Sequence, residues 1–335
     1  MTMQDPLVSV VTPVYNGEKY LAVCIESVLA QTYQNWDYVI VNNCSTDNTL
    51  EIAQHHAGKD KRIKVVSNHQ FVGVIENHNI AFRLISEESK YCKVVSADDW
   101  LYPECLSKMV RLAEAHPSVG IVGSYQLTST NIVKWKGLPP NVETISGREV
   151  CRLGILNMLD VFGGTTSSLY RSDLIRKNIP FFPHLRPYAD TSAVYKYLQY
   201  CDYGFVHEIL STERSHHESV GARIKQLGMG EFRDLDKTLQ YGPIYFGENE
   251  FTMLKKEALT TYWRHLGGYL LNLAGLEFWR FHASGLRELG YPFPWRKVLK
   301  GAIDEIIDEM HNPKVALHKL FTVVKNKFQI KSTIW

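Results

Sequence analysis

The sequence lacks the features that mark membrane, secreted and nucleic-acid-binding proteins. Its 335 residues contain no run approaching the roughly 18 to 20 apolar residues that span a bilayer. The first residues, MTMQDPLVSVV, carry an acid and a proline where a signal peptide needs basic and apolar residues. The 37 basic and 35 acidic side chains give a net charge of only +2, so charge alone does not indicate a nucleic-acid partner. We therefore expect a soluble, cytoplasmic protein.

Cysteine is sparse, and glycine-rich phosphate loops are missing. The six cysteines show no CxxC spacing, which disfavours a zinc site and predicts reduced, structural thiols. Neither GxGxxG nor GxxxxGK(S/T) follows the first apolar run. The sequence therefore does not indicate dinucleotide-dependent redox chemistry or a P-loop.

Short apolar runs alternate with helical patterns over the first part of the chain. Strands are expected at 7–15, 36–43, 62–68, 91–99 and 119–127, with helices between them. The strands of a parallel sheet are covered on both faces and read as near-continuous apolar runs. We therefore predict an α/β fold with a Rossmann-like, mostly parallel central sheet and helices on both faces. In such sheets, ligands bind beyond the carboxyl ends of the strands.

Polar residues stand at these carboxyl ends. They are Thr12–Tyr15, Asn42–Cys44, Asn68 and the adjacent pair Asp98–Asp99 of VVSADDWLYPE. Two neighbouring carboxylates repel each other, and a carboxylate at the end of a buried strand is costly unless something pairs with it. One interpretation is that the two carboxylates cap the helix expected from about Pro103. We expect all of these polar segments to converge on one crevice.

Two longer segments carry a specific resemblance. Residues 8–49, VSVVTPVYNGEKYLAVCIESVLAQTYQNWDYVIVNNCSTDNT, and residues 95–106, VSADDWLYPECL, resemble the family 2 glycosyltransferases of the GT-A fold. YADTSAVYKYL and ERSHHES match more loosely, so the resemblance covers about residues 7–220. It implies inverting transfer of a sugar from a nucleotide-diphosphate sugar to a hydroxyl of a glycan or lipid-linked glycan, in cell-surface polysaccharide or glycan biosynthesis. It also implies a divalent cation, Mn²⁺ or Mg²⁺.

The resemblance assigns the carboxylate pair to the donor and its metal. Asp99 would ligate the cation, and Asp98 would contact the ribose or nearby donor atoms. A hard cation prefers oxygen ligands and cancels the repulsion between a carboxylate and a diphosphate. His216 would be a further metal ligand with Arg214 beside it, unless both are surface residues on a polar turn.

Other donor-binding residues follow from the same resemblance. Thr12, Pro13 and Tyr15 would frame the base. Asn43 stands where the family often carries an acid, and an amide can accept one hydrogen bond from a base and donate another. His78 is closest to a family arginine, so it would contact the diphosphate unless it lies on a helix surface.

Asp190 is the expected catalytic base. In the family, a carboxylate at this position takes the proton of the acceptor hydroxyl, which requires it to lie within hydrogen-bond reach of that hydroxyl. Ala189 stands where the family often has another acid, so the assignment depends on Asp190 alone. The alternative is that Asp190 caps a helix over 191–200.

The chain is expected to have three parts. Residues 1–127 would form the nucleotide-sugar-binding half of the GT-A domain, 128–225 its acceptor-binding half, and 226–335 a C-terminal helical region. The final stretch carries no acid and five lysines: Lys314, Lys319, Lys325, Lys327 and Lys331. It predicts either a membrane-surface helix or a helix that packs on its own domain or on a second subunit.

Two other functions remain open. A sugar-1-phosphate nucleotidyltransferase would also use an α/β sheet and a metal, but TPVYNGEKYL lacks the Gly-rich, basic loop expected of that class. An inactive glycosyltransferase-like binding module would not need Asp98, Asp99 and Asp190, which the chain retains.

Overall fold

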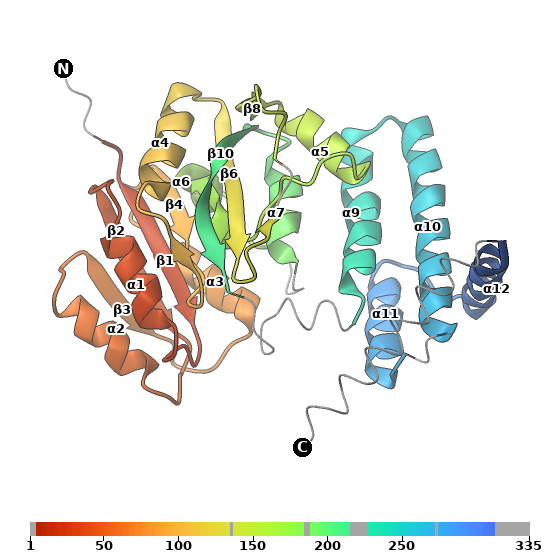
Figure 1. Cartoon of the computed structure of the whole chain (residues 1–335), viewed down its shortest axis with the longest axis horizontal. Helices are drawn as coiled ribbons and strands as arrows, with labels where there is room; N and C mark the ends of the chain where they lie inside the picture. Colours follow the sequence, from red (N-terminus) through yellow and green to blue (C-terminus); the bar gives the residue numbers. More distant parts are fainter. Residues whose placement is uncertain (1–4, 135–136, 184–187, 215–226, 272–273, 312–335) are drawn as a thin grey trace. The chain divides into compact units, whose positions relative to one another are not determined.

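A computed structural model describes residues 5–134, 137–183, 188–214, 227–271 and 274–311 and is drawn in Figure 1. The chain divides into two compact units. The first comprises Met1–Arg223 with Tyr241–Phe246, and the second comprises Ile224–Gln240 with Gly247–Trp335.

One sheet of ten strands forms the centre of the first unit in the described part of the chain (Figure 1). Its main path runs β3-β2-β1-β4-β9-β6-β10-β5, while β7 pairs with β6 and β8 with β10. The strands are β1 Val8–Val14, β2 Trp36–Asn42, β3 Ile63–Ser67, β4 Tyr91–Val94, β5 Trp100–Leu101, β6 Val119–Thr128, β7 Val133–Lys134, β8 Thr144–Ile145, β9 Ser168–Arg171 and β10 Asp202–Glu213.

The predicted parallel arrangement holds for the first half of the sheet. β3, β2, β1 and β4 pair in parallel, with Val11 of β1 opposite both Val39 of β2 and Val94 of β4. The second half is mixed, because β9 lies antiparallel between β4 and β6. β9 has only four residues, and its pairing with two distant strands leaves no local sequence signal.

Helices cover both faces of this sheet. They are α1 Leu21–Leu29, α2 Thr49–Ala57, α3 Val74–Arg83, α4 Cys105–Ala115, α5 Gly147–Ile155, α6 Ser172–Arg176 and α7 Ala189–Tyr197. On one face, α1 buries Leu21, Cys24, Ile25 and Val28 at helical spacing in an apolar core that also contains Met109 of α4. These apolar positions explain why the segment folds as a helix against the sheet.

Aromatic rings fill the opposite face. Phe82 of α3 meets Phe181 edge-on with ring centroids 4.9 Å apart, and Phe181 stacks on Tyr197 of α7 at 4.6 Å. Tyr170 of β9 lies 5.4 Å from Phe181. Edge-on and stacked rings stabilise a core beyond the area they bury, so this cluster ties α3, β9 and α7 together.

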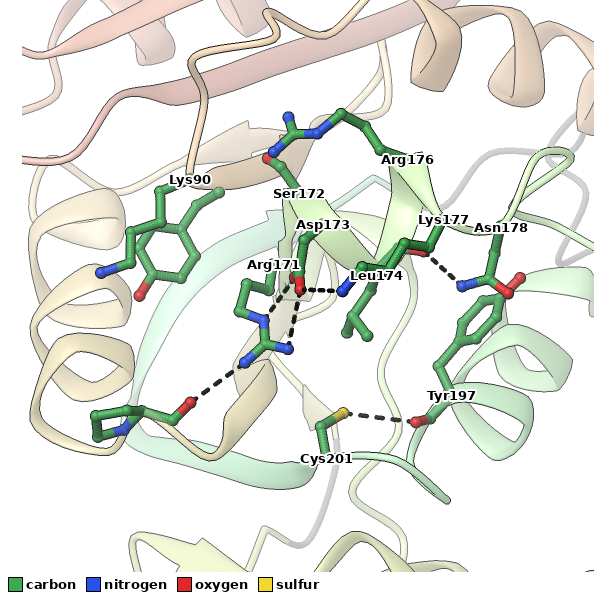
Figure 2. A network of polar contacts seen from close by, with 12 residues as sticks. Lys90, Arg171, Ser172, Asp173, Leu174, Arg176, Lys177, Asn178, Tyr197 and Cys201 are labelled. Atoms are coloured by element: carbon green, nitrogen blue, oxygen red, sulfur yellow. Dashed lines mark hydrogen bonds and ion pairs between the residues drawn. The ribbon is translucent and has the colours of Figure 1, made fainter.

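A network of charged side chains joins β9 to α6 (Figure 2). Arg171, the last residue of β9, donates to the two carboxylate oxygens of Asp173 at 2.6 and 3.2 Å and to the carbonyl of Pro117 at 3.2 Å. Lys177 reaches the same carboxylate at 3.3 Å. These contacts hold β9 in place between its two partner strands.

The second unit is helical in its described residues, which confirms the predicted C-terminal helices. They are α9 Met229–Tyr245, whose last turn belongs to the first unit, α10 Glu248–Leu271, α11 Leu276–Glu288 and α12 Trp295–His311. Among the helices described, none combines the length and the apolar composition needed to cross a membrane.

α10 and α12 touch backbone to backbone at two glycines. A Cβ atom added to Gly267 would lie 2.2 Å from the amide nitrogen of Ala302, and one added to Gly301 would lie 2.5 Å from the carbonyl oxygen of Trp263. Both distances are shorter than any real contact of a Cβ atom, so only glycine permits this approach.

We expect Gly267→Ala to destabilise the second unit by about 1–3 kcal/mol, because the added methyl group must push α12 away. Gly268→Ala is the matched control, since a Cβ atom there meets nothing within 4 Å. It should leave stability unchanged or raise it by up to about 1 kcal/mol through helix propensity. Urea unfolding followed by circular dichroism measures both, and equal stability of the two variants would contradict the packing described.

Candidate active site

The carboxyl ends of the parallel strands meet at one edge of the sheet, as predicted. The main-chain amide of Asn43 donates to the carbonyl of Val14 at 2.8 Å, and the main-chain amide of Asn68 donates to the main-chain carbonyl of Asn42 at 2.9 Å. Main-chain bonds of this kind join the ends of β1, β2 and β3. The polar segments after these strands and after β4 therefore occupy one region.

The turn that contains the carboxylate pair is braced from three sides. Val95 donates its amide to Val11 at 3.0 Å, and its carbonyl accepts from the Thr12 hydroxyl at 2.8 Å. The amide of Ser96 donates to the hydroxyl of Thr166 at 3.1 Å. The amide of Asp99 donates back to Ser96 at 3.0 Å and closes the turn. The position of Asp99 is thus set by β1, by the turn itself and by a residue 67 positions later.

Asp99 is buried and hydrogen-bonded at both carboxylate oxygens. It is 6% exposed. Its Oδ2 accepts from the Thr166 hydroxyl at 2.6 Å, and its Oδ1 accepts from the amide of Arg214 at 3.1 Å. Burial, and next the charge of Asp98, raise the pKa of Asp99 to about 8, while the two hydrogen bonds oppose this shift. The carboxylate form is thus costly until another positive charge arrives.

These residues fit a hard divalent cation. A carboxylate oxygen can accept more than one contact, so each oxygen of Asp99 retains a lone pair beyond its hydrogen bond. Mg²⁺ and similar ions are commonly held by one or two carboxylates, with substrate phosphates and water completing the shell. In the described residues, no group of three or more His, Cys, Asp or Glu side chains gathers to hold a metal by itself. The expected ligand His216 lies outside the described residues.

Arg214 lies beside the carboxylate pair. Its guanidinium carbon is 4.3 Å from the ring centroid of Tyr20 and 5.1 Å from that of Trp100. Its Nε donates to the carbonyl of Asp98 at 3.2 Å. Contacts with two aromatic rings and one hydrogen bond hold the guanidinium group of Arg214 in place. A positively charged side chain therefore borders the site before any ligand binds.

Of the residues expected to frame the base, two are buried in the sheet and one is exposed. Thr12 and Pro13 are buried within β1, and the Thr12 hydroxyl also bonds that of Tyr38 at 2.8 Å. Thr12 and Pro13 therefore lie inside the sheet, below the surface of its carboxyl edge. Tyr15 is 49% exposed and meets Phe71, itself 59% exposed, with ring centroids 4.8 Å apart. The two rings form an exposed aromatic pair on the loops after β1 and β3.

Asn43 and His78 also make internal contacts. Side-chain Oδ1 of Asn43 accepts from Nδ2 of Asn68 at 2.9 Å and from the main-chain amide of Val72 at 3.0 Å. Nδ2 of Asn43 donates to the carbonyl of Val72 at 2.8 Å. This side chain thus fixes the loop after β3. On α3, Nδ1 of His78 donates to the Val74 carbonyl at 2.8 Å, and desolvation lowers the pKa of His78.

Asp190 stands in the first turn of α7 and not at its cap. The helix begins at Ala189, and Oδ1 of Asp190 accepts from the amide of Thr191 at 2.7 Å. After burial, the charge of Asp190 is the largest cause that raises the pKa of Tyr170 in β9. Tyr170 thus senses the charge of Asp190, and Thr166, four residues before Tyr170, bonds Asp99.

Two residues that belong to this site, Thr166 and Lys93, were not predicted from the sequence. Thr166 stands in η1, a 3₁₀ turn over Thr165–Ser167, and nothing near it in the sequence points to Asp99. Lys93 is fully buried in β4. A lysine inside the apolar run YCKVV was a readable signal, since lysine is almost never buried without a reason.

A model of the family described as "Glycosyl transferase family 2" matches residues 9–177. This match covers half of the chain, and the chain therefore belongs to the family. The match agrees with the glycosyltransferase resemblance and gives no support to the nucleotidyltransferase alternative. Asp98, Asp99 and Thr166 lie inside the match, whereas Asp190 and His216 lie beyond it.

Curated relatives match over the first part of the chain. An uncharacterized glycosyltransferase of Haemophilus influenzae is 38% identical over 120 residues, covering 36% of each chain. The glycosyltransferase GlyG of Streptococcus pneumoniae is 31% identical over 119 residues, covering 36% of this chain and 39% of GlyG. TuaG of Bacillus subtilis, named for teichuronic acid biosynthesis, is 36% identical over 110 residues, or 33% of this chain and 43% of TuaG. The chain thus matches less than half the length of these relatives.

Solved structures share the fold. Staphylococcus aureus TarS residues 1–349 in complex with UDP-GlcNAc superimposes with a TM-score of 0.62 at 18% identity, covering 87% of this chain and 82% of that one. The mannosyltransferase PcManGT of Pyrobaculum calidifontis, in complex with GDP-Man and Mn²⁺, gives 0.53 at 17% identity, covering 92% and 89%. The predicted GT-A architecture is thereby confirmed.

The raised pKa of Asp99 predicts a pH-dependent stability of the metal-free protein. Unfolding returns Asp99 to its ordinary pKa near 4, so between about pH 4 and 8 the unfolded chain releases a proton that the folded chain keeps. Stability should therefore fall as pH rises, by up to about 1.4 kcal/mol per pH unit. Asp99→Asn should remove this slope in thermal unfolding from pH 5 to 8 with EDTA. Asp98→Asn should move the slope to lower pH, and a wild-type slope retained in Asp99→Asn would contradict the assignment.

Proposed function

We propose that the protein is an inverting, metal-dependent glycosyltransferase that uses a nucleotide-diphosphate sugar and acts in cell-surface polysaccharide or glycan biosynthesis. The observation that carries the proposal is the buried Asp99, held by two hydrogen bonds at the carboxyl edge of the sheet and raised in pKa. Such a carboxylate needs a positive partner, and a cation with a diphosphate supplies one. TuaG, named for teichuronic acid biosynthesis, supports the cell-surface role.

The donor would lie across this edge. Asp99 would hold Mn²⁺ or Mg²⁺, which as a Lewis acid would stabilise charge on the leaving diphosphate. Asp98 would contact the ribose or nearby donor atoms. Arg214 would add a second positive charge near the same oxygens. The exposed pair Tyr15–Phe71 offers an aromatic surface for a base. Two solved structures of similar fold, one in complex with UDP-GlcNAc and one with GDP-Man, support a nucleotide-sugar donor. They do not indicate which of the two bases it carries.

Asp190 would activate the acceptor. Its carboxylate would take the proton of the acceptor hydroxyl as that oxygen bonds to the anomeric carbon. The bond from the anomeric carbon to the diphosphate breaks on the opposite face, and its electron pair leaves with the nucleoside diphosphate. Displacement from the opposite face inverts the anomeric configuration.

Two matched variants test these roles. Asp190→Asn should keep donor binding within about twofold and lower transfer by about 10²- to 10⁴-fold, the usual contribution of a general base. Asp99→Asn should abolish the Mn²⁺-dependent part of donor binding. Thermal-shift titration with UDP-GlcNAc and GDP-Man, with and without Mn²⁺, measures binding, and release of UDP or GDP measures turnover.

The outcomes separate the alternatives. Loss of donor binding in Asp190→Asn would show that Asp190 is not the base. Unchanged Mn²⁺ dependence in Asp99→Asn would refute the metal assignment. Binding without any donor hydrolysis or transfer by the wild type would favour the inactive binding module.

We also propose that the C-terminal region contacts an anionic membrane surface. Exposed apolar side chains follow one another along α12: Trp295, Leu299, Ile303, Ile306 and Ile307. Arg296, Lys297 and Lys300 are exposed on the first turns of the same helix. The sequence beyond residue 311 adds five lysines and no acid. The first turns of α12, where tryptophan and leucine alternate with cations, are typical of helices that lie on lipid surfaces, whereas Asp304 and Glu305 stand beside Ile303 and Ile306.

Vesicle sedimentation tests this contact. The wild type should bind phosphatidylglycerol vesicles and bind uncharged phosphatidylcholine vesicles at least tenfold more weakly. The double variant Leu299→Ser/Ile303→Ser should lose at least tenfold in affinity, because two apolar side chains no longer enter the lipid. Met253→Ser, at a more exposed apolar site on α10, is the control. A dimer in light scattering that only the double variant disrupts, without vesicle binding, would instead assign the stripe to a second subunit.

A further inference from the structure

Lys93 is a buried lysine in the centre of the sheet, and desolvation lowers the pKa of its amine. It stands in β4, opposite Val10 of β1 and Leu169 of β9, and has no exposed surface. Burying an ammonium group costs several kcal/mol, and proteins usually offset that cost with a carboxylate partner. A methionine of similar length would fill the same space without the cost. The lysine therefore calls for an explanation.

The contacts of Lys93 are directed at one short segment. Its Nζ donates to the carbonyl of Thr166 at 2.6 Å and to that of Ser168 at 3.2 Å, with Sδ of Met109 3.6 Å away. Both carbonyls belong to the chain that leads from η1 into β9. Two hydrogen bonds from one buried amine therefore fix this segment at two points.

Thr166 carries this restraint to the carboxylate. Its carbonyl accepts from Lys93, while its hydroxyl accepts from the Ser96 amide at 3.1 Å and donates to Oδ2 of Asp99 at 2.6 Å. One residue thus bonds the buried amine through its backbone and the metal-binding turn through its side chain. A shift of η1 would move the hydroxyl away from both ends of that turn.

We propose that Lys93 is a positioning residue for Asp99, acting through the Thr166–Ser168 segment. The amine holds the segment, the Thr166 hydroxyl holds Asp99 and Ser96, and the turn is thereby kept in the geometry that a cation needs. The part of this inference that concerns metal binding rests on the proposed function. The part that concerns the turn applies to the metal-free protein.

A double-mutant cycle tests the linkage. Lys93→Met removes the donor, and Thr166→Val removes the hydroxyl while keeping the side-chain shape. Lys90→Met, at an exposed lysine three residues earlier, and Thr165→Val, beside Thr166 in η1, are the matched controls. Binding of Mn²⁺, with UDP absent or present, is measured by electron paramagnetic resonance of the free ion. Hydrogen exchange of residues 96–99 in the metal-free protein is the second readout.

Each single variant should weaken Mn²⁺ binding by about 10- to 100-fold, as is usual for residues that orient a metal ligand. The double variant should be no more than about twofold weaker than the worse single variant, because both act through one hydrogen bond. Exchange at residues 96–99 should rise in both single variants, and both controls should match the wild type. If Lys93→Met does not fold, Lys93→Leu, which also lacks a donor, takes its place with the same expectations.

Unchanged exchange at residues 96–99 in the Lys93 variant would overturn the inference. So would losses of Mn²⁺ affinity that multiply in the double variant, because they would show that the two residues act independently. A wild type that does not bind Mn²⁺, together with raised exchange in both variants, would refute the proposed metal dependence and still support the positioning role.

Discussion

The hydrogen bond from the Thr166 hydroxyl to Asp99 joins the two halves of the sheet at the point where the chemistry is expected. Asp99 follows β4, which ends the parallel half of the sheet. Thr166 precedes β9, which begins the mixed half. A carboxylate removed from water needs donors, and those that Asp99 uses come from elements distant in sequence, Thr166 and Arg214. Folding of the second half of the sheet is therefore a condition for a formed site.

The rest of the first unit keeps that contact in register. On one face, α1 and α4 pack a largely apolar core against the strands, and the side chain of Lys93 is buried there. On the other, the rings of Phe82, Phe181 and Tyr197 hold α3 and α7 against β9. The Arg171–Asp173 network then fixes the end of β9 (Figure 2). A strand of four residues is positioned from both sides and from its end because it carries the approach to Asp99.

Family membership and fold bear on different parts of the chain. The family match ends at residue 177, before Asp190 and before all of the second unit. It thus covers the strands whose carboxyl ends carry Asp98 and Asp99. The second unit depends on a different constraint, a backbone contact between α10 and α12 that only Gly267 and Gly301 allow.

The sequence by itself determined the strand–helix order, the carboxyl-edge location of Asp98–Asp99 and the family, because apolar periodicity and contiguous motifs are local properties. It also indicated the helical C-terminal region. Only the tertiary structure decided that β9 runs between β4 and β6, that the side chains of Thr12 and Asn43 are used internally, and that Thr166 and Lys93 support Asp99. Those facts depend on hydrogen bonds between residues far apart in the chain. Such partners are selected by packing and burial, which no short segment of sequence encodes.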